Sequence, residues 1–415
     1  MTVVPHSLDG APWLTADAVQ AVFAALGRDG DEVRVVGGAV RNALLGVDVV
    51  DIDFATTATP DLVAARAEAA GFKAVPTGVE HGTLTLVVEG RGFEVTTLRE
   101  DIETDGRRAV VKFGRNWLAD ARRRDFTVNA LYVDATGVVL DPLDGYGDLV
   151  AGRIRFIGAP EERIAEDRLR ILRFFRFHAQ YGTGGLDRAG LSASIRGRDG
   201  IRSLSGERVG REVRQLVVAG GALPVVAAMQ DAGILPIVLG GIGYLASFRR
   251  LHELEYAMAA AAEVPLRLAA LGCRIDEDVA RLADRLRLSN AERDRMRAAV
   301  NAIDGFLDSP DRRQARRILY RLGGQTYRDA AALGFSWGVG AADDPSWRDL
   351  LALPGTWRAP TFPLAGRDVI TQTRLRGPAV GALIKELEAW WIENDFAPDE
   401  RALRHRLQQL VAAAQ

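Results

Sequence analysis

The sequence predicts an α+β protein, in which an N-terminal α/β head with a mixed sheet of about five strands precedes a long all-helical part. From Glu32 to about Asp148, short runs rich in β-branched residues alternate with stretches of helical periodicity. From Pro160 onward the pattern is almost entirely helical, with short breaks rich in Gly, Pro, Asp and Ser. At 415 residues, the chain is expected to form two to four domains.

Composition narrows the class of protein. A hydrophobic content of 48% and a charged content of 26% are ordinary for a soluble globular protein. The single cysteine, Cys273, excludes a disulfide framework and a cysteine-based zinc site. The N-terminus lacks signal-peptide features and no apolar run reaches the ~18 residues of a membrane span, so we predict a cytoplasmic protein with no membrane partner.

Charge is unevenly distributed along the chain. The net charge is −2, yet residues 107–214 contain 21 Arg and Lys against 14 Asp and Glu. This asymmetry favours a surface that binds a polyanion. A composition that is simply rich in arginine remains the alternative.

The first elements surround a double glycine. The pattern predicts a helix over 12–28, a strand over 32–36 and a helix over 38–46, with Gly37 and Gly38 at the junction. Bare backbone N–H groups at a helix N-terminus favour an anion, and the missing side chains allow a phosphate group to approach closely. Arg41, one turn later, adds a possible phosphate contact, whereas a plain strand-to-helix turn is the alternative.

Two aspartates follow in the segment VVDIDFAT. Because side chains alternate along a strand, Asp51 and Asp53 are predicted to share one face while Ile52 and Phe54 enter the core. Two neighbouring carboxylates repel each other unless a cation or protons lie between them, and such oxygen ligands suit Mg²⁺. An exposed acidic strand edge would have the same pattern.

The remaining elements continue the head and then the helical part. A helix is predicted over 60–70, and TLTLVVEGRGFEVTTL is predicted to form a hairpin that turns at Gly90–Gly92. Strands are also predicted over 126–134 and 137–141, and a helix over 276–303.

With these elements in place, the motifs show a resemblance. GGAVRNALLG and DIDFAT are followed in order by RRDFTVNALYVD (123–134), DPLDGYGDL (141–149), RIAEDRLRILRFFRF (163–177) and GERVGRE (206–212). This series resembles the class II CCA-adding tRNA nucleotidyltransferase and poly(A) polymerase family of the nucleotidyltransferase superfamily. One departure is Asn42, where that family usually has Asp, which puts in doubt the anchoring that an Asp would provide.

The resemblance implies a chemistry for the acidic residues. An RNA 3′-hydroxyl would attack the α-phosphate of a nucleoside triphosphate with Mg²⁺ bound by Asp51 and Asp53. Glu94, in GFEVTTLR, stands where the family places a third carboxylate, and an ordinary exposed strand residue is the alternative.

It also implies the nucleotide-binding residues. Arg123 and Arg124 would bind phosphates and Asp125 would accept a hydrogen bond from a ribose hydroxyl, unless the three form a salt-bridge cluster at a helix end. Asp167 and Arg170, three residues apart on a predicted helix, would present an acceptor and a donor to the base and so select CTP and then ATP without a template. A surface ion pair is the alternative for Asp167 and Arg170.

We expect Arg173 and Arg176 to continue the basic stripe of this helix toward the triphosphate or tRNA. The bracing of this helix is expected from Glu207, Arg208 and Glu212.

For one polar segment, two histidines and two tryptophans, the sequence predicts structural roles. We expect residues 99–116 to form a mobile loop, or a plain hairpin loop, and His81 and His178 to be structural. Trp390 and Trp391 are expected to lie in the core of a C-terminal helical domain.

The resemblance also suggests five parts of the chain. They are an N-terminal helix packing on the head (1–30), the catalytic head (31–150), a helical neck with the nucleotide-selecting motif (151–218), a helical body (219–350) and a helical, tRNA-binding tail (351–415).

The resemblance thus implies an enzyme that adds CCA to tRNA 3′ ends from CTP and ATP. A poly(A) polymerase and an enzyme adding only part of CCA share the same head, so they remain alternatives. A non-catalytic RNA-binding protein is a further alternative, against which the intact acidic and basic motifs argue.

Overall fold

The computed structural model describes residues 2–4, 6–78, 82–105, 108–307, 310–338, 344–373 and 375–413, without the side chains of 100–112 and 413. His81, predicted to be structural, lies outside the described residues. The chain divides into two compact units, Met1–Gly241 and Ile242–Gln415. The finer division into five parts remains a prediction.

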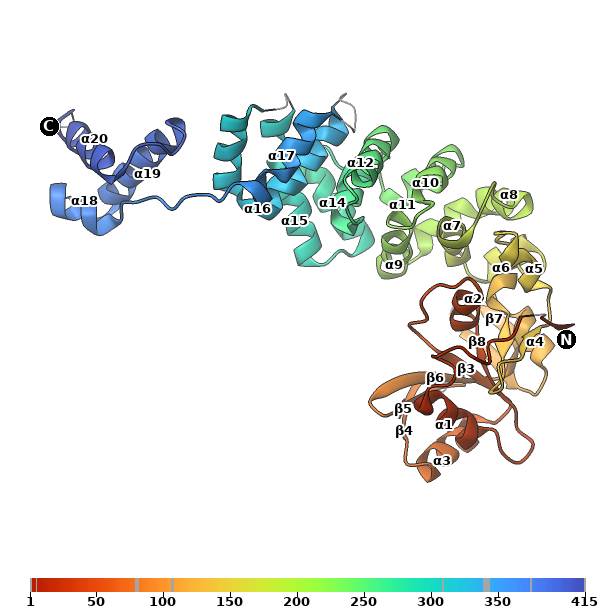
Figure 1. Cartoon of the computed structure of the whole chain (residues 1–415). Coiled ribbons are helices and arrows are strands. Elements are labelled where there is room, and N and C mark those ends of the chain that lie inside the picture. Colours follow the sequence, from red (N-terminus) through yellow and green to blue (C-terminus); the bar gives the residue numbers. More distant parts are fainter. Residues whose placement is uncertain are drawn as a thin grey trace. The chain divides into compact units, whose positions relative to one another are not determined.

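The first unit contains the predicted mixed sheet (Figure 1). Its described residues form eight strands rather than about five, in the order β1-β10-β9-β2-β3-β6-β5-β4, and among these strands only the β3–β6 pair is parallel. The additional strands are short or lie at an edge, where sequence periodicity is weak. The strands are β1 (Thr2–Val3), β2 (Val33–Val36), β3 (Asp53–Thr56), β4 (Lys73–Gly78), β5 (Thr83–Val88), β6 (Arg91–Thr97), β9 (Tyr132–Val133) and β10 (Val139–Asp141).

The predicted hairpin and the predicted loop are both present as strand pairs. β5 and β6 pair as a hairpin whose turn lies at Glu89–Gly90, slightly before the predicted Gly90–Gly92, since both residues have positive φ angles. Residues 99–116, predicted to be a loop, contain the antiparallel strands β7 (Arg99–Asp105) and β8 (Arg108–Phe113).

Helices cover the head and continue the first unit beyond it. The helices of this unit are α1 (Asp17–Leu26), α2 (Gly38–Leu44), α3 (Pro60–Ala69), α4 (Trp117–Arg122), α5 (Gly145–Val150), α6 (Pro160–Glu166), α7 (Leu169–Tyr181), α8 (Arg188–Gly197), α9 (Gly206–Val217), α10 (Ala222–Asp231) and α11 (Leu235–Leu239), with 3₁₀ helices η2 (Thr127–Asn129) and η3 (Arg198–Ser203). The strand expected over 126–134 is therefore partly a 3₁₀ helix, and only its end enters the sheet as β9.

The second unit is helical, as predicted. Its helices are α12 (Leu245–Ala257), α13 (Val264–Gly272), α14 (Asp276–Leu286), α15 (Asn290–Asn301), α16 (Arg312–Trp337), α17 (Pro345–Thr356), α18 (Gly366–Thr373), α19 (Pro378–Glu393) and α20 (Glu400–Ala413), with the 3₁₀ helix η4 (Ile303–Phe306). The single helix expected over 276–303 is two helices, because Ser289 caps α15 through a capping box with Glu292. Trp391 is buried in a core built around α18–α20 and Trp390 packs against it, as predicted. Within the described ranges, no helix combines the length and apolar composition that a bilayer crossing requires.

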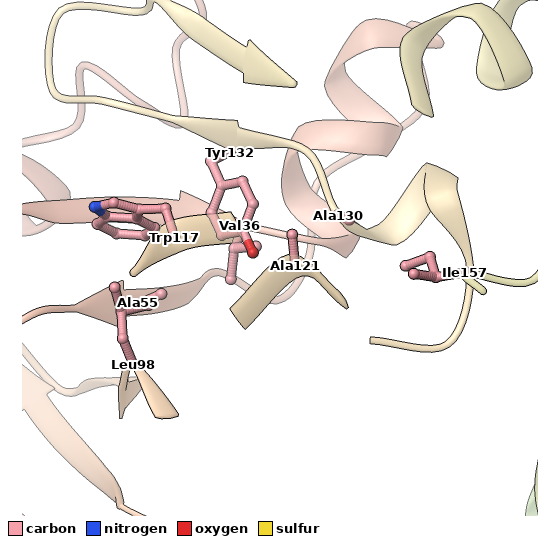
Figure 2. Packing of buried hydrophobic residues seen from close by; sticks show 8 residues of the cluster. All are labelled: Val36, Ala55, Leu98, Trp117, Ala121, Ala130, Tyr132 and Ile157. Carbon is pink, nitrogen blue, oxygen red and sulfur yellow. The ribbon is translucent and has the colours of Figure 1, made fainter. Parts of the chain in front are cut away.

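A buried cluster supports the strands that carry the glycine turn and the aspartates. Val36, at the end of β2, packs with Ala55 of β3, with Trp117 and with Tyr132 (Figure 2). On the other side of β3, Phe54 contacts Phe23 and Phe93 edge to face, with ring centroids 5.2 and 5.9 Å apart. This packing fixes the ends of both strands where the site begins.

The motif DPLDGYGDL supports the neighbouring segment RRDFTVNAL. The carboxylate of Asp141 accepts hydrogen bonds from the backbone N–H groups of Leu143, Gly145 and Tyr146. Asp148 accepts a hydrogen bond of 2.6 Å from Thr127. Gly145 lies so close to Thr127 that an added Cβ would be 2.2 Å from its carbonyl oxygen. A glycine at this position therefore lets α5 pack directly against η2.

This contact predicts that Gly145→Ala destabilises the protein. The added methyl group has to displace backbone, for which a cost of about 1–3 kcal/mol is typical of overpacked sites. Chemical denaturation measures the change in the free energy of unfolding. Gly147→Ala in the same helix is the control, because its Cβ would meet its nearest atom, in the Asp144 side chain, at 3.6 Å. Equal stabilities of the two variants would contradict the prediction.

Candidate active site

The predicted site residues come together around one cavity of the first unit. The cavity has a volume of about 570 Å³, within the usual range for a small-molecule site. Twelve of the thirteen predicted residues line it, and Glu94 is the exception. Asn129 and Phe177 also line it and were not predicted as site residues. The lining consists of Gly37, Gly38, Arg41, Asp51, Asp53, Arg123, Arg124, Asp125, Asn129, Asp167, Arg170, Arg173, Arg176 and Phe177.

Strand pairing places the acidic residues. Ile52 and Phe54 are buried in the core, whereas Asp51 and Asp53 both line the cavity, as the alternation predicted. Asp53 is paired in register with Glu94 of the parallel strand β6. Loss of surrounding water raises the pKa of Asp53 to about 6, the charges of Glu94 and Asp51 add to this, and Arg124 opposes it. The three carboxylates therefore interact electrostatically.

This acidic group fits a divalent metal ion only with help from a substrate. Within the described part of the chain, no three His, Cys, Asp or Glu side chains converge closely enough to hold a metal by themselves. Asp51 and Asp53 supply two oxygen ligands, and their mutual repulsion is what a bound cation would relieve. Water and phosphate oxygens would complete such a site.

The glycine turn begins beside these carboxylates. Val36 of β2 pairs with Asp53, so the turn at Gly37 starts at the same edge of the sheet. Gly37 has a φ of 74°, a conformation that glycine adopts without strain. Both glycines line the cavity, as the predicted phosphate-binding turn requires.

Arg41 is held rigidly behind the turn. It is only 6% exposed, and its guanidinium donates hydrogen bonds to Asn42, Asn129 and Tyr181. Burial lowers the pKa of Arg41, and no carboxylate of the described residues forms an ion pair with it. It therefore contributes a positive charge to the cavity that a bound anion can compensate.

Asn42, which stands where the family usually has Asp, makes hydrogen bonds that an Asp could not all make. Its Oδ1 accepts hydrogen bonds from Arg41 at 3.2 and 2.8 Å, and its Nδ2 donates to the carbonyl oxygen of Asp48 at 3.1 Å. A carboxylate could accept from Arg41 but could not donate to Asp48. The amide thus anchors Arg41 and also holds the loop that leads to Asp51.

Sequence reasoning missed the carboxylate that orders Arg123 and Arg124. Asp120 is fully buried and accepts hydrogen bonds from both arginines and from Tyr132. Burial acts to raise the pKa of Asp120, but Arg124 and Arg123 outweigh it and hold the pKa below its ordinary value. The i,i+3 and i,i+4 spacing of these residues in DARRRD was a signal that could have identified it.

Asp125 orients Arg173. One carboxylate oxygen accepts from Arg173 at 2.7 and 2.6 Å, and the other accepts from Asn129 and from the backbone N–H of Phe126. Although burial alone would raise the pKa of Asp125, Arg173 and Asn129 hold it below its ordinary value. These four bonds use the usual accepting capacity of a carboxylate. A ribose hydroxyl, the predicted partner, would have to displace one of them.

Glu212 and Phe177 order the other arginines. Glu212 pairs with Arg176 at 2.5 Å and with Arg173 at 3.8 Å, which is the predicted bracing role. The guanidinium groups of Arg41, Arg173 and Arg176 all lie 4.1–5.1 Å from the ring centroid of Phe177. Phe177 is therefore a shared surface on which three cations are placed.

The predicted base-selecting pair has a different geometry from the one expected. Asp167 is not on a helix with Arg170, since α6 ends at Glu166 and Asp167 has extended backbone angles. Its Oδ2 accepts a hydrogen bond of 2.7 Å from Arg208, and Arg170 pairs with Glu166. Asp167 and Arg170 nevertheless line the same cavity.

His178 has no sign of a catalytic role. It is 7% exposed in α7, and burial lowers its pKa. It does not line the cavity, so the prediction that it is structural agrees with its position.

The chain is similar to known proteins both in sequence and in structure. A family model described as the poly A polymerase head domain matches residues 33–155. The chain is 30% identical over 399 residues to the mouse (Mus musculus) protein named CCA tRNA nucleotidyltransferase 1, mitochondrial, covering 94% of this chain and 89% of that one. It is 42% identical over 207 residues to the CCA-adding enzyme of Oceanobacillus iheyensis, covering 49% and 50%. The structure is similar, with a TM-score of 0.75 and 25% identity, to that of the Bacillus stearothermophilus CCA-adding enzyme in complex with CTP, covering 96% and 98% of the two chains.

The raised pKa of Asp53 predicts a stability effect. Because the folded pKa of about 6 exceeds the ordinary 3.8, this group's contribution is fully present below pH 3.8 and is lost as the pH rises through 6. Asp53→Asn should therefore raise Tm at pH 7.5 without divalent cations. We expect roughly 2–4 °C, the shift for about 1 kcal/mol after allowing for solvent screening.

Thermal unfolding of both proteins at pH 7.5 and pH 4 measures this effect, and the gain should shrink at pH 4. Asp61→Asn is the control, because that exposed carboxylate favours the N-terminus of α3 and its loss should not raise Tm. A Tm for Asp53→Asn no higher than that of the wild type at pH 7.5 would contradict the account.

Proposed function

Because the chain belongs to the CCA-adding tRNA nucleotidyltransferase family, we propose that it adds CCA to the 3′ ends of tRNA from CTP and ATP and releases pyrophosphate. No nucleic acid acts as template in this reaction. Instead, side chains of the protein recognise each base in turn. The single cavity that brings together acidic, phosphate-binding and base-reading residues carries the proposal.

Base recognition is assigned to Asp167 and Arg170. CTP and ATP both present an amino donor next to a ring-nitrogen acceptor, whereas UTP and GTP present a carbonyl next to a ring N–H. A carboxylate accepts from the amino group and a guanidinium donates to the ring nitrogen, so the pair is complementary to CTP and ATP only. The partners Arg208 and Glu166 support this assignment, because they hold the two side chains in fixed orientations.

The triphosphate is assigned to the glycine turn and the arginines. Gly37 and Gly38 let phosphate oxygens approach the backbone, and Arg41 adds a positive charge that no carboxylate of the described residues compensates by an ion pair. Arginine also offers two parallel hydrogen bonds to phosphate. The remaining phosphate-binding arginines in this proposal are Arg123, Arg124, Arg173 and Arg176.

Asp51 and Asp53 are the proposed ligands of a divalent metal ion, and Glu94 is the proposed third carboxylate. We expect the ion to be Mg²⁺, since the donors are oxygens and a triphosphate supplies the others. When bound, such an ion stabilises the negative charge that develops on the transferred phosphate. The crowding that raises the pKa of Asp53 supports this assignment.

The head alone does not separate CCA addition from poly(A) synthesis. The match to the poly A polymerase head domain ends at residue 155, before Asp167 and Arg170. The number and kind of nucleotides added therefore have to be measured.

The test uses purified protein, Mg²⁺ and tRNA that lacks its last three nucleotides. We predict addition of two nucleotides with CTP alone and of three with CTP and ATP together, resolved on a sequencing gel. Intact tRNA should not be extended. The variant with both Asp51→Asn and Asp53→Asn is the control, and it should transfer nothing while still binding tRNA.

Other products would replace the proposal. Long A tails would identify a poly(A) polymerase, and addition of only CC or only A would identify a partial enzyme. Binding of tRNA without any transfer would identify an RNA-binding protein.

A further inference from the structure

Arg163 joins two parts of the site from behind the cavity. It lies in α6, is 9% exposed and does not line the cavity. Its Nη2 donates hydrogen bonds to the carbonyl oxygens of Arg123 and Arg124, the latter at 2.9 Å. It therefore holds the main chain that carries the two phosphate-binding arginines.

The other side of the same guanidinium faces the base-reading residue. Nη1 of Arg163 donates to both carboxylate oxygens of Glu166, at 2.7 and 2.5 Å. Glu166 also accepts a hydrogen bond from Arg170, and the carbonyl oxygen of Arg163 accepts another from Arg170 at 2.9 Å. Arg170 thus rests on two groups that Arg163 supplies or orients.

Stability alone is a poor reason for this arrangement. Arg163 and Arg170 are two cations that share the single carboxylate of Glu166, and burial lowers the pKa of Arg163. Its Nε is also buried without a hydrogen-bond partner among the described residues. A buried cation that is incompletely paired costs free energy, so a gain in stability does not account for Arg163 at this position.

We propose that Arg163 is a positioning residue that fixes the distance between the base-reading Arg170 and the main chain of Arg123 and Arg124. The proposal rests on the proposed function, because it assumes that these residues bind the base and the triphosphate of one nucleotide. In one nucleotide, the ribose sets the distance between the base and the triphosphate. Arg170 and the main chain of Arg123 and Arg124 must therefore keep a matching distance from each other. Arg163 links these two recognition elements directly by hydrogen bonds, although α6 and the segment after α4 are distant in sequence.

A second link joins the segment after α4 to α7, the helix that carries Arg170, and it acts differently. Asp125 and Arg173 connect α7 to this segment through their side chains. Arg163 instead binds main-chain carbonyl groups, so its loss would let the backbone and Arg170 shift independently. The expected result is poorer base discrimination together with weaker nucleotide binding.

The experiment compares Arg163→Gln and Arg163→Lys with the wild type. With tRNA lacking CCA as the acceptor, we would measure kcat and KM for CTP and kcat/KM for UTP. Thermal unfolding gives the Tm of each protein. For Arg163→Gln we expect the CTP-to-UTP ratio of kcat/KM to fall at least about tenfold, a factor that corresponds to about 1.4 kcal/mol. The KM for CTP should rise while kcat changes less. Arg163→Lys should recover part of the ratio, because an ammonium group can hold some of the partners but not all of them.

Arg196→Gln is the matched control. Arg196 lies in α8 and pairs with Glu161 of α6, the helix that carries Arg163. The side chain of Arg196 is 60% exposed and does not line the cavity. Its substitution removes the same charge and should leave the ratio unchanged.

The outcomes separate this proposal from the proposed function. An unchanged CTP-to-UTP ratio in Arg163→Gln, with only a lower Tm or lower kcat, would overturn the positioning role and leave a structural brace. If Arg163→Gln does not fold, the ratio for Arg163→Lys decides in the same way. A wild type that adds neither CTP nor ATP to tRNA would instead refute the proposed function.

Discussion

Shared carboxylates hold the arginines of this site in place, and the rest of the arrangement depends on them. Asp120 serves Arg123 and Arg124, Glu166 serves Arg163 and Arg170, and Glu212 serves Arg173 and Arg176. Each carboxylate orders two guanidinium groups but neutralises only one charge. The cavity is therefore lined by preordered cations, which suits a triphosphate and lowers the entropic cost of binding it.

The negative charges of the site are placed by strand pairing in the sheet rather than by ion pairs. The parallel pairing of β3 and β6 sets Asp53 beside Glu94, and the antiparallel pairing of β2 and β3 sets the glycine turn beside Asp53. Backbone hydrogen bonds thus place a metal-binding edge next to a phosphate-binding turn. Because the carboxylates repel one another, the free protein holds them at a cost that ligand binding relieves.

Local sequence signals predicted much of this site, and long-range pairing accounts for what they missed. Alternation along one strand correctly placed Asp51 and Asp53, and the order of the motifs pointed to Arg170 and Asp125. The links from Arg163 to Arg123 and Arg124, and from Arg208 to Asp167, join residues about 40 positions apart, and no spacing rule contains such contacts. The helical geometry expected for Asp167 was wrong because the chain leaves α6 at that residue. The edge strand β1 was missed because two residues show no measurable periodicity, and the edge strand β4 (KAVPTG) was missed because its proline and glycine weaken the strand signal.

We infer that side chains of the protein, rather than a nucleic-acid template, select the base. Equilibrium binding of CTP and UTP to the wild type and to Asp167→Asn, measured without RNA, tests this inference. We expect the wild type to bind CTP at least about tenfold more tightly than UTP, a difference of about 1.4 kcal/mol, and Asp167→Asn to lose most of this preference. Asp199→Asn, at an exposed carboxylate whose nearest ion-pair distance is 3.9 Å, should keep it. Equal affinity of the wild type for CTP and UTP, or an unchanged preference in Asp167→Asn, would contradict the account.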